Sequence, residues 1–146
     1  MQPFIGAAVE AWPRIRACLE GMAGADEILA AMQTPIFAQH LGEDGTSLVG
    51  ERMTIIANDL DWEGHLVEGP FLWKQDGRYW LFYAANDFTD PAYGIGVAVA
   101  DRPLGPYVKR SDPLLSSAKS WSAPGHPSVA EGPDGTPHIF FHAFLP

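Results

Sequence analysis

The chain has 146 residues and a formal net charge of −9, and 47% of its residues are hydrophobic. This length fits one domain with a sizeable core. The acidic charge balance disfavours nucleic acid and anionic membrane surfaces as partners, because both attract clustered Lys and Arg. A neutral ligand such as a small carbohydrate, or a cation, is compatible with that charge.

Cellular location is predicted from what the sequence lacks. The single cysteine, Cys18, excludes an intramolecular disulfide, so the chain does not need an oxidising compartment. No apolar run reaches the roughly 18 residues of a membrane-spanning helix. Glu10, Pro13 and Arg14 interrupt the N-terminal segment where a signal peptide would be apolar. We therefore expect a cytoplasmic protein.

Residues 1–34 are predicted to form a helical hairpin with an apolar face. Large apolar residues recur there at spacings of three and four, which is typical of one helix face: Trp12, Ile15, Leu19 and Met22. Pro13 fits the first turn, and Gly21 or Gly24 can end the helix. A second short helix is expected to open near Asp26 and to carry Ile28, Leu29 and Met32. Cys18 is interpreted as a small buried residue rather than a nucleophile, because only two Arg residues lie near it.

From Pro35 onward the pattern changes to short strands separated by turn signals, which is typical of antiparallel β structure. The strands are predicted at residues 36–41, 48–57, 69–84 (a hairpin), 94–100, 107–109, 127–130 and 138–144. Asp76-Gly77, between two aromatic-rich runs, favours a type I′ hairpin turn. Residues 111–125 are predicted to be irregular.

The strands group in fours, as in the blades of a β-propeller. Residues 69–110 would form one four-stranded meander, while residues 36–57 and 127–144 would supply two strands each. A second hairpin around Asp134-Gly135 repeats the plan of the first. The predicted fold is therefore mainly β, a partial propeller of about two blades. It comprises a helical segment at 1–34 and a propeller-like β domain at 35–146.

Over about residues 35–145 the sequence resembles glycoside hydrolase family 43, whose members are five-bladed propellers that cleave xylosides and arabinosides with inversion. The likeness lies in the order and spacing of several segments: 36–39, 44–45, 48–51, Val67-Glu68-Gly69-Pro70, 77–83, 96–98, 103–107 and 121–129. The chain is about half of a full catalytic domain, and residues 1–34 match nothing in the family.

The resemblance implies roles for two residues. Glu68 falls on the general acid of the family, the carboxyl group that protonates the leaving oxygen. His126 falls on a histidine near the propeller axis, which in many relatives helps to hold water or a central metal ion such as calcium. The general base and the third carboxylate of the family lie in the first two blades, and nothing in this chain matches them.

Further candidates come from the loops and the last strand. Asp87 and Asp90 could act as a second carboxylate, although such residues more often form turns. His138 and His142 alternate on one strand face, which is a weak signal for a metal site.

Aromatic residues are the other source of candidates. Phe88 and Trp121 are the better candidates for stacking on a sugar, and Asn86 is a further substrate-binding candidate. The remaining large aromatics are expected mainly in the core: Trp62, Phe71, Trp73, Trp80 and Phe82.

Three functions are compatible with these features. The favoured one is a truncated glycosidase-like protein that is not catalytically competent alone but keeps a sugar-binding pocket around Glu68 and His126. The second in order is a structural or interaction module. The third is an active glycosidase completed by oligomerisation.

Eight strands cannot close a propeller ring, and the exposed sheet edges need a cover. Either the helices of residues 1–34 pack over a blade face, or half-blades of different subunits complete each other. We expect the second arrangement, a homo-oligomer that is a dimer or a trimer.

Overall fold

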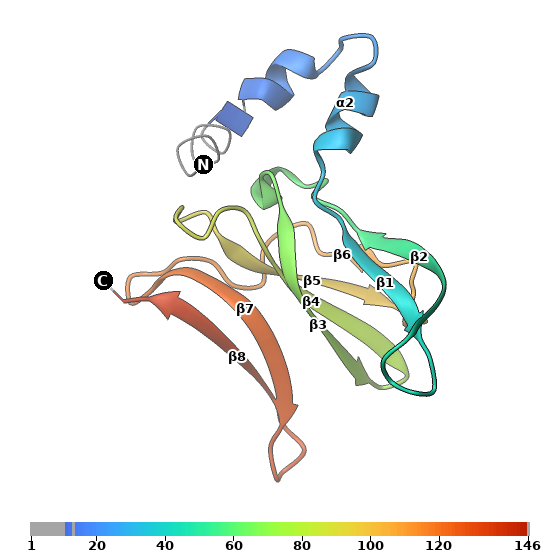
Figure 1. Cartoon of the computed structure of the whole chain (residues 1–146). Helices are drawn as coiled ribbons and strands as arrows, with labels where there is room; N and C mark the ends of the chain where they lie inside the picture. The colour runs from blue at the N-terminus through green and yellow to red at the C-terminus, as the bar shows by residue number, and fades with distance from the viewer. Residues whose placement is uncertain (1–10, 13, 146) are drawn as a thin grey trace.

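The computed structural model describes residues 11, 12 and 14–145, and strands dominate it (Figure 1). In chain order the elements are α2 (Ala25–Met32), β1 (Ile36–Leu41), β2 (Leu48–Ile56), the 3₁₀-helix η1 (Asp61–Glu63), β3 (Val67–Gln75), β4 (Arg78–Ala85), β5 (Gly94–Ala100), β6 (Val108–Lys109), β7 (Ser122–Glu131) and β8 (Pro137–Phe144). Residues 11, 12 and 14–19 are also helical.

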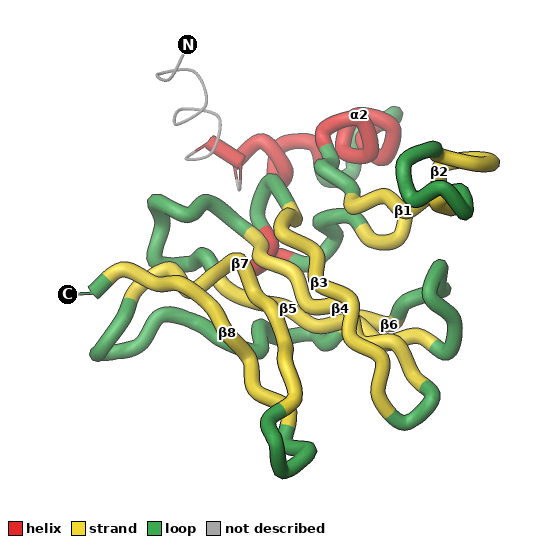
Figure 2. Tube along the Cα trace, turned by 60° about the horizontal axis from the view of Figure 1, so that its bottom comes forward, coloured by secondary structure: helices red, strands yellow, loops and turns green. Residues whose placement is uncertain are grey.

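The strands form three antiparallel sheets. The central sheet has the order β3-β4-β5-β6, and β1-β2 and β7-β8 are separate two-stranded sheets. The two small sheets lie on opposite sides of the central sheet in both views of the chain (Figures 1 and 2). This arrangement of one full blade between two half-blades confirms the prediction of a mainly β, partial propeller.

The β3–β4 hairpin turns where the sequence indicated. Asp76 and Gly77 both have positive φ, 51° and 73°, as the two central residues of a type I′ turn require. The start of β7 was predicted wrongly. Residues 122–125 were expected to be irregular, but β7 begins at Ser122, with register shifts on both sides of Gly125. Packing against β3, β4 and β5 holds this Pro- and Gly-containing stretch in the strand despite its irregular backbone.

The core lies on both faces of β4, because alternate residues of a strand point to opposite faces. On one face, Leu81, Tyr83 and Ala85 pack in a cluster that also contains Ile36 and Ile56 of the β1-β2 half-blade. On the other face, three buried residues from β4, the following loop and β7 pack together: Ala84, Tyr93 and Ala123. Both half-blades are thus fixed to the central sheet.

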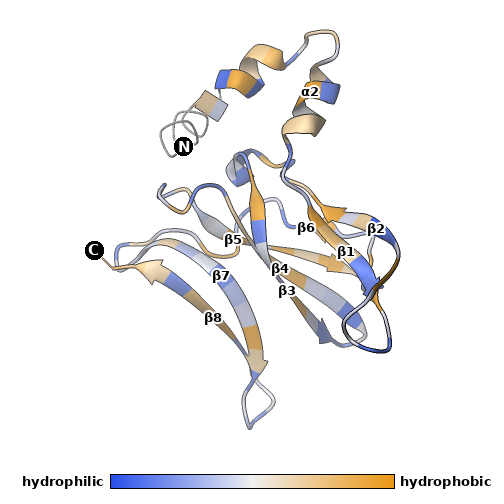
Figure 3. Ribbon diagram, in the orientation of Figure 1, coloured by the Kyte–Doolittle hydropathy of each residue, from blue (hydrophilic) through white to orange (hydrophobic). Residues whose placement is uncertain are grey.

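The aromatic residues expected in the core are only half-buried: Trp62, Phe71, Trp73, Trp80 and Phe82. In the described β domain the buried aromatics are instead two tyrosines, Tyr83 and Tyr93. Strands β1, β2 and β8 also carry apolar residues (Figure 3). Several of their side chains are exposed, among them Leu41, Leu48 and Phe140.

The N-terminal helices contact the β sheets through the loop before β3. Arg16 Nη1 lies 3.2 Å from Asp61 Oδ1, and the Thr34 backbone N–H donates to Asn58 Oδ1 at 2.8 Å. In Figure 1 the helices lie at the end of the strands and not over a blade face.

Several side chains of these helices differ from expectation. Trp12 is buried as its spacing suggested, but Met22, Ile28 and Met32 are exposed, and so is Cys18. Among the apolar positions whose side chains the structure describes, the predicted face is therefore buried at Trp12, half-buried at Ile15 and Leu19 and exposed at Met22 and beyond. Pro13 lies outside the described residues. Among the residues that the structure describes, no helix combines the length and hydropathy needed to cross a membrane.

Candidate functional site

A pocket of about 410 Å³ opens along the seam between the central sheet and the β7-β8 hairpin. The elements on its two sides are β3 and the β4–β5 loop, and β7 and β8. Its lining residues are Glu68, Phe88, Tyr93, Ala123, His126, His142, Ala143 and Phe144. Pockets of this size are typical of small-molecule sites.

Glu68 reaches the pocket from a distorted part of β3. The register between β3 and β4 is irregular between Glu68 and Phe71, and Gly69 has a φ of 58°. The distortion frees the Glu68 side chain, which is exposed at the pocket. At this point β3 also lies next to β7, since a Cβ added at Gly69 would be 3.7 Å from the Cα of His126.

Tyr93 holds the Glu68 carboxyl group in place. The phenol of Tyr93, only 3% exposed, donates a hydrogen bond to Glu68 Oε1 at 2.7 Å. The ring lies where a Cβ of residue 125 would project, so only glycine fits at Gly125. Burial, reinforced by the hydrogen bond to Glu68, raises the pKa of Tyr93 well above its usual value. The phenol therefore stays protonated and remains a donor at neutral pH.

The β7 side of the pocket is built from unusual backbone. Ala123 and His126 have φ values of 51° and 53°, in the left-handed region that non-glycine residues rarely adopt. Such residues cost roughly 1–3 kcal/mol each and cluster at functional sites. The rings of His126 and His142 stack at 5.9 Å between centroids. Two imidazoles and one carboxyl group therefore meet within one pocket.

The profile of Glycosyl hydrolases family 43 matches residues 22–146. This chain belongs to glycoside hydrolase family 43. The resemblance inferred from the sequence is thus confirmed, with one correction: the match starts at residue 22 and includes α2, which the sequence analysis had placed outside it.

Among curated relatives, a beta-D-galactofuranosidase of Aspergillus niger is 34% identical over 104 residues, covering 70% of this chain and 28% of the relative. A beta-xylosidase of Xylanibacter ruminicola is 36% identical over 80 residues, 55% of this chain and 21% of the relative. The matched region of this family-43 chain therefore spans less than a third of either relative.

Two solved structures resemble this chain in fold and sequence. A thermostable family-43 glycoside hydrolase superposes with a TM-score of 0.70 and 40% identity over 75% of this chain and 38% of that one. An endo-1,4-beta-xylanase from Bacteroides thetaiotaomicron has the same TM-score with 34% identity, and its match covers 40% of that chain.

Glu68, His126 and Phe88, which the sequence nominated, all line the pocket. Trp121 and Asn86 do not. The Trp121 indole donates to the Ser116 carbonyl at 3.1 Å, and its ring packs edge-on against Phe141. The pocket residues that sequence reasoning did not nominate for substrate binding are Tyr93, Ala123, His142, Ala143 and Phe144.

Asn86 has a structural role beside the pocket. Its side-chain Nδ2 donates to the Trp62 carbonyl at 3.0 Å, and its backbone N–H donates to the Glu63 carbonyl at 2.9 Å. Asn86 therefore joins the loop before β3 to the loop that carries Phe88 and Tyr93.

The other predicted acidic residues serve their own turns. Asp87 accepts hydrogen bonds from the hydroxyl and backbone N–H of Thr89, and the hydroxyl bond is the main cause that lowers the Asp87 pKa. Asp90 accepts from the backbone N–H of Ala92 at 2.7 Å. Neither residue lines the pocket, so Glu68 is the one carboxylate among the lining residues that the structure describes.

The residues at the pocket do not fit a calcium ion. Calcium prefers six to eight oxygen ligands, whereas His126 and His142 offer nitrogen. Within the described part of the chain, no group of three or more His, Cys, Asp or Glu residues is arranged to hold a metal. His138 contacts its own turn and not this pair of histidines: its Nδ1 is 2.8 Å from the Thr136 carbonyl oxygen.

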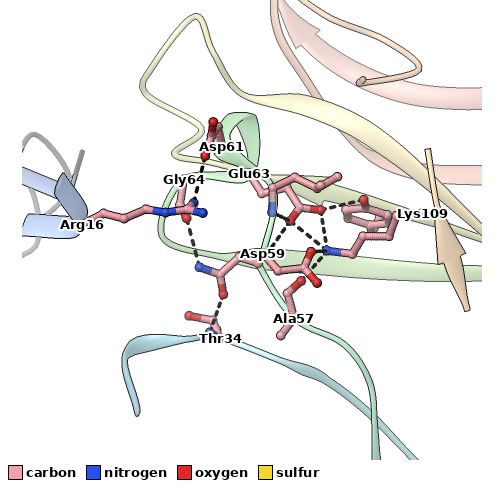
Figure 4. A network of polar contacts seen from close by, with 11 residues as sticks. Arg16, Thr34, Ala57, Asp59, Asp61, Glu63, Gly64 and Lys109 are labelled. Atoms are coloured by element: carbon pink, nitrogen blue, oxygen red, sulfur yellow. Dashed lines mark hydrogen bonds and ion pairs between the residues drawn. The ribbon is translucent and has the colours of Figure 1, made fainter. Parts of the chain in front are cut away.

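A second polar cluster, which the sequence did not reveal, lies beneath the loop before β3 (Figure 4). Glu63 is fully buried, and Lys109 Nζ donates to its two carboxylate oxygens at 2.7 and 2.8 Å. The Tyr83 phenol donates to Glu63 Oε1 at 2.7 Å, and the backbone N–H groups of Asp59 and Leu60 donate to Oε2. This cluster ties η1 and β6 to the core and so fixes the loop that leads into Glu68.

Proposed function

We propose that this pocket binds a neutral sugar of the xylose or arabinose type, with Glu68 at the proton-donating position of a glycosidase site. One observation carries the proposal: the Glu68 carboxyl, held by Tyr93 at 2.7 Å, faces a pocket lined by aromatic and imidazole rings. Pockets of this kind, mostly apolar with a few polar groups, suit small organic ligands. The names of the relatives, among them beta-xylosidase and endo-1,4-beta-xylanase, favour a carbohydrate.

The chemistry of inverting hydrolysis defines what Glu68 would do. A protonated carboxyl group gives its proton to the glycosidic oxygen as the bond from that oxygen to the anomeric carbon breaks. A second carboxylate on the opposite face of the sugar, roughly 6.5–9.5 Å away, takes a proton from the attacking water. The pocket lining supplies the first group and not the second. Alone, the chain is therefore expected to bind a sugar without hydrolysing it.

Binding and turnover must be measured on the same preparation. Calorimetry with xylose, xylobiose and arabinose should give saturable binding, and aryl xylosides and arabinosides should release no phenol above background. Glu68→Gln removes the carboxyl group from the pocket, and Asp90→Asn is the matched control, because the Asp90 side chain accepts a hydrogen bond within its own turn. Hydrolysis that Glu68→Gln abolishes would overturn the proposal that the chain binds a sugar without hydrolysing it. Absence of sugar binding would overturn the proposal that the pocket is a sugar site.

A second candidate function has its own observation. β1, β2 and β8 belong to two-stranded sheets and expose large apolar side chains: Leu41, Leu48, Val49, Phe140 and Phe144. Strands with free edges and apolar faces favour pairing with other strands. A dimer or trimer formed in this way could bring a carboxylate of another subunit opposite Glu68. Hydrolysis that rises more steeply than protein concentration, together with an oligomer in light scattering, would identify this candidate.

A further inference from the structure

Two phenylalanines line the pocket without packing in the core. Phe88 is 57% exposed and Phe144 is 59% exposed. Phe88 belongs to the loop after β4, whereas Phe144 ends β8, so the two rings come from two different blades. Exposed aromatic side chains inside a pocket offer apolar surface that a ligand can bury.

The polar groups of the pocket are few and differ in kind from these walls. Glu68 uses Oε1 to accept the hydrogen bond from Tyr93, and no other described residue donates to its Oε2. His126 and His142 stack on each other, and both are exposed at the pocket. One carboxylate oxygen and the imidazole nitrogens are therefore placed to bind hydroxyl groups of a ligand.

We propose that Phe88 and Phe144 are stacking walls that select a pyranose whose hydroxyl groups are all equatorial, as in a β-xylopyranoside. This inference rests on the proposed function, because it assumes that the pocket binds a sugar. An all-equatorial pyranose carries C–H groups on both faces and hydroxyl groups around its rim. Both faces can then contact phenyl rings while the rim reaches Glu68 and the two histidines.

Other sugars match two apolar walls less well. A pyranose with an axial hydroxyl group presses a polar atom against one wall, and burying such an atom without a hydrogen bond is costly. An arabinofuranose has a puckered five-membered ring with an exocyclic arm and cannot offer two flat apolar faces. The two walls therefore predict discrimination between sugars that share the same number of hydroxyl groups.

The chain contains a closely matched control for the test. Phe140 lies on β8 with Phe144 and is 58% exposed, but it does not line the pocket. Truncation of either residue removes the same number of exposed apolar atoms from the same strand. Any difference between Phe140→Ala and Phe144→Ala in sugar binding therefore reports the pocket and not the strand.

The experiment is an NMR titration of each variant with methyl β-D-xylopyranoside and methyl α-L-arabinofuranoside. Phe88→Ala and Phe144→Ala should each weaken binding of the xyloside about fivefold to tenfold, equivalent to about 1–1.4 kcal/mol. Phe140→Ala should bind it like the wild type, and Phe144→Trp should bind it at least as tightly. The wild type should prefer the xyloside to the arabinofuranoside.

Three results would overturn the inference, and they are distinguishable. If the wild type binds the xyloside and Glu68→Gln weakens binding while both Phe→Ala variants do not, the walls are wrong and the proposed function stands. If the arabinofuranoside binds as tightly as the xyloside, the selected sugar class is wrong. If neither glycoside binds the wild type, the proposed function fails and the walls fail with it.

Discussion

Replacement of Lys109 by Met tests whether the buried Glu63–Lys109 pair holds the loop before β3. Glu63 has no exposed surface, and the Lys109 side chain is only 10% exposed. The substitution keeps an unbranched apolar stem of similar length and removes the ammonium group. Glu63 would then keep its hydrogen bonds from Tyr83 and the Asp59 and Leu60 backbones, but it would lose its buried counter-ion.

The expected cost follows from that geometry. Removal of one partner of a buried ion pair costs about 3–5 kcal/mol, because the remaining charge is left without compensation in a medium of low polarity. A domain has only about 5–15 kcal/mol of stability in total. The melting temperature of this chain should fall by roughly 10 °C.

The assay is urea unfolding followed by tryptophan fluorescence, with the midpoint and slope compared between variants. Arg78→Met is the matched control, because Arg78 lies 3.5 Å from Asp101 with side chains that are 54% and 89% exposed. An exposed pair should contribute about 0–1 kcal/mol. The double variant Glu63→Gln/Lys109→Met should recover much of the loss, since it removes both charges. If Lys109→Met costs no more than Arg78→Met, the pair does not hold the loop and the reasoning is refuted.

Three further predictions concern the pocket, the buried tyrosines and one turn. Gly125→Ala should displace the Tyr93 ring and weaken sugar binding at least as much as Tyr93→Phe does, because its Cβ would overlap that ring; equal binding by Gly125→Ala and the wild type in calorimetry would contradict this. Burial raises the pKa of Tyr83 and Tyr93 above the ordinary value of 10.0. A raised folded pKa means that the stabilisation is complete below about pH 10 and is lost as pH rises toward the folded pKa. Urea unfolding should therefore show a loss of up to about 1.4 kcal/mol per pH unit for each tyrosine above about pH 10, with a smaller slope in Tyr93→Phe. Hydrogen bonds from backbone N–H groups of its own turn lower the pKa of Asp44 from 3.8 to about 2. The stabilisation that Asp44 gives to the β1–β2 turn should therefore be complete above about pH 3.8 and be lost as pH falls through about 2. An NMR titration midpoint near 3.8 would be inconsistent with that turn.

Local signals in the sequence were sufficient for most of the strands. The Asp76-Gly77 turn was predictable because positive φ at two adjacent positions is a property of those two residues alone. The start of β7 was not predictable, because its place in the fold depends on packing against strands that lie earlier in the chain. Propensity alone gives Ala123-Pro124-Gly125 no reason to be a strand.

The two pocket residues with implied roles, Glu68 and His126, could be paired from the sequence only through the family resemblance. Their proximity depends on Gly69 and on the left-handed backbone of His126. Neither position carries a sequence signal that it approaches the other. Tyr93 was missed for a related reason. A tyrosine in a loop carries no signal, and its approach to Glu68 depends on the glycine at position 125.

Burial is a tertiary property, and two contacts had no signal in the sequence for this reason. Trp121 was interpreted as a stacking candidate because it lies in a loop, and its edge-on contact with Phe141 depends on how β8 packs. Glu63 lies in a polar stretch whose composition does not indicate burial. Its burial depends on Lys109, which belongs to the two-residue strand β6 far along the chain.

The position of the pocket at the seam between two blades has a consequence for how such a site can diversify. The central sheet and its loop contribute Glu68, Tyr93 and Phe88, whereas the β7-β8 hairpin contributes His126 and Phe144. Exchange of that hairpin would change one side of the pocket while the residues around the carboxyl group stayed in place. The two sides of the pocket can therefore be altered separately in design.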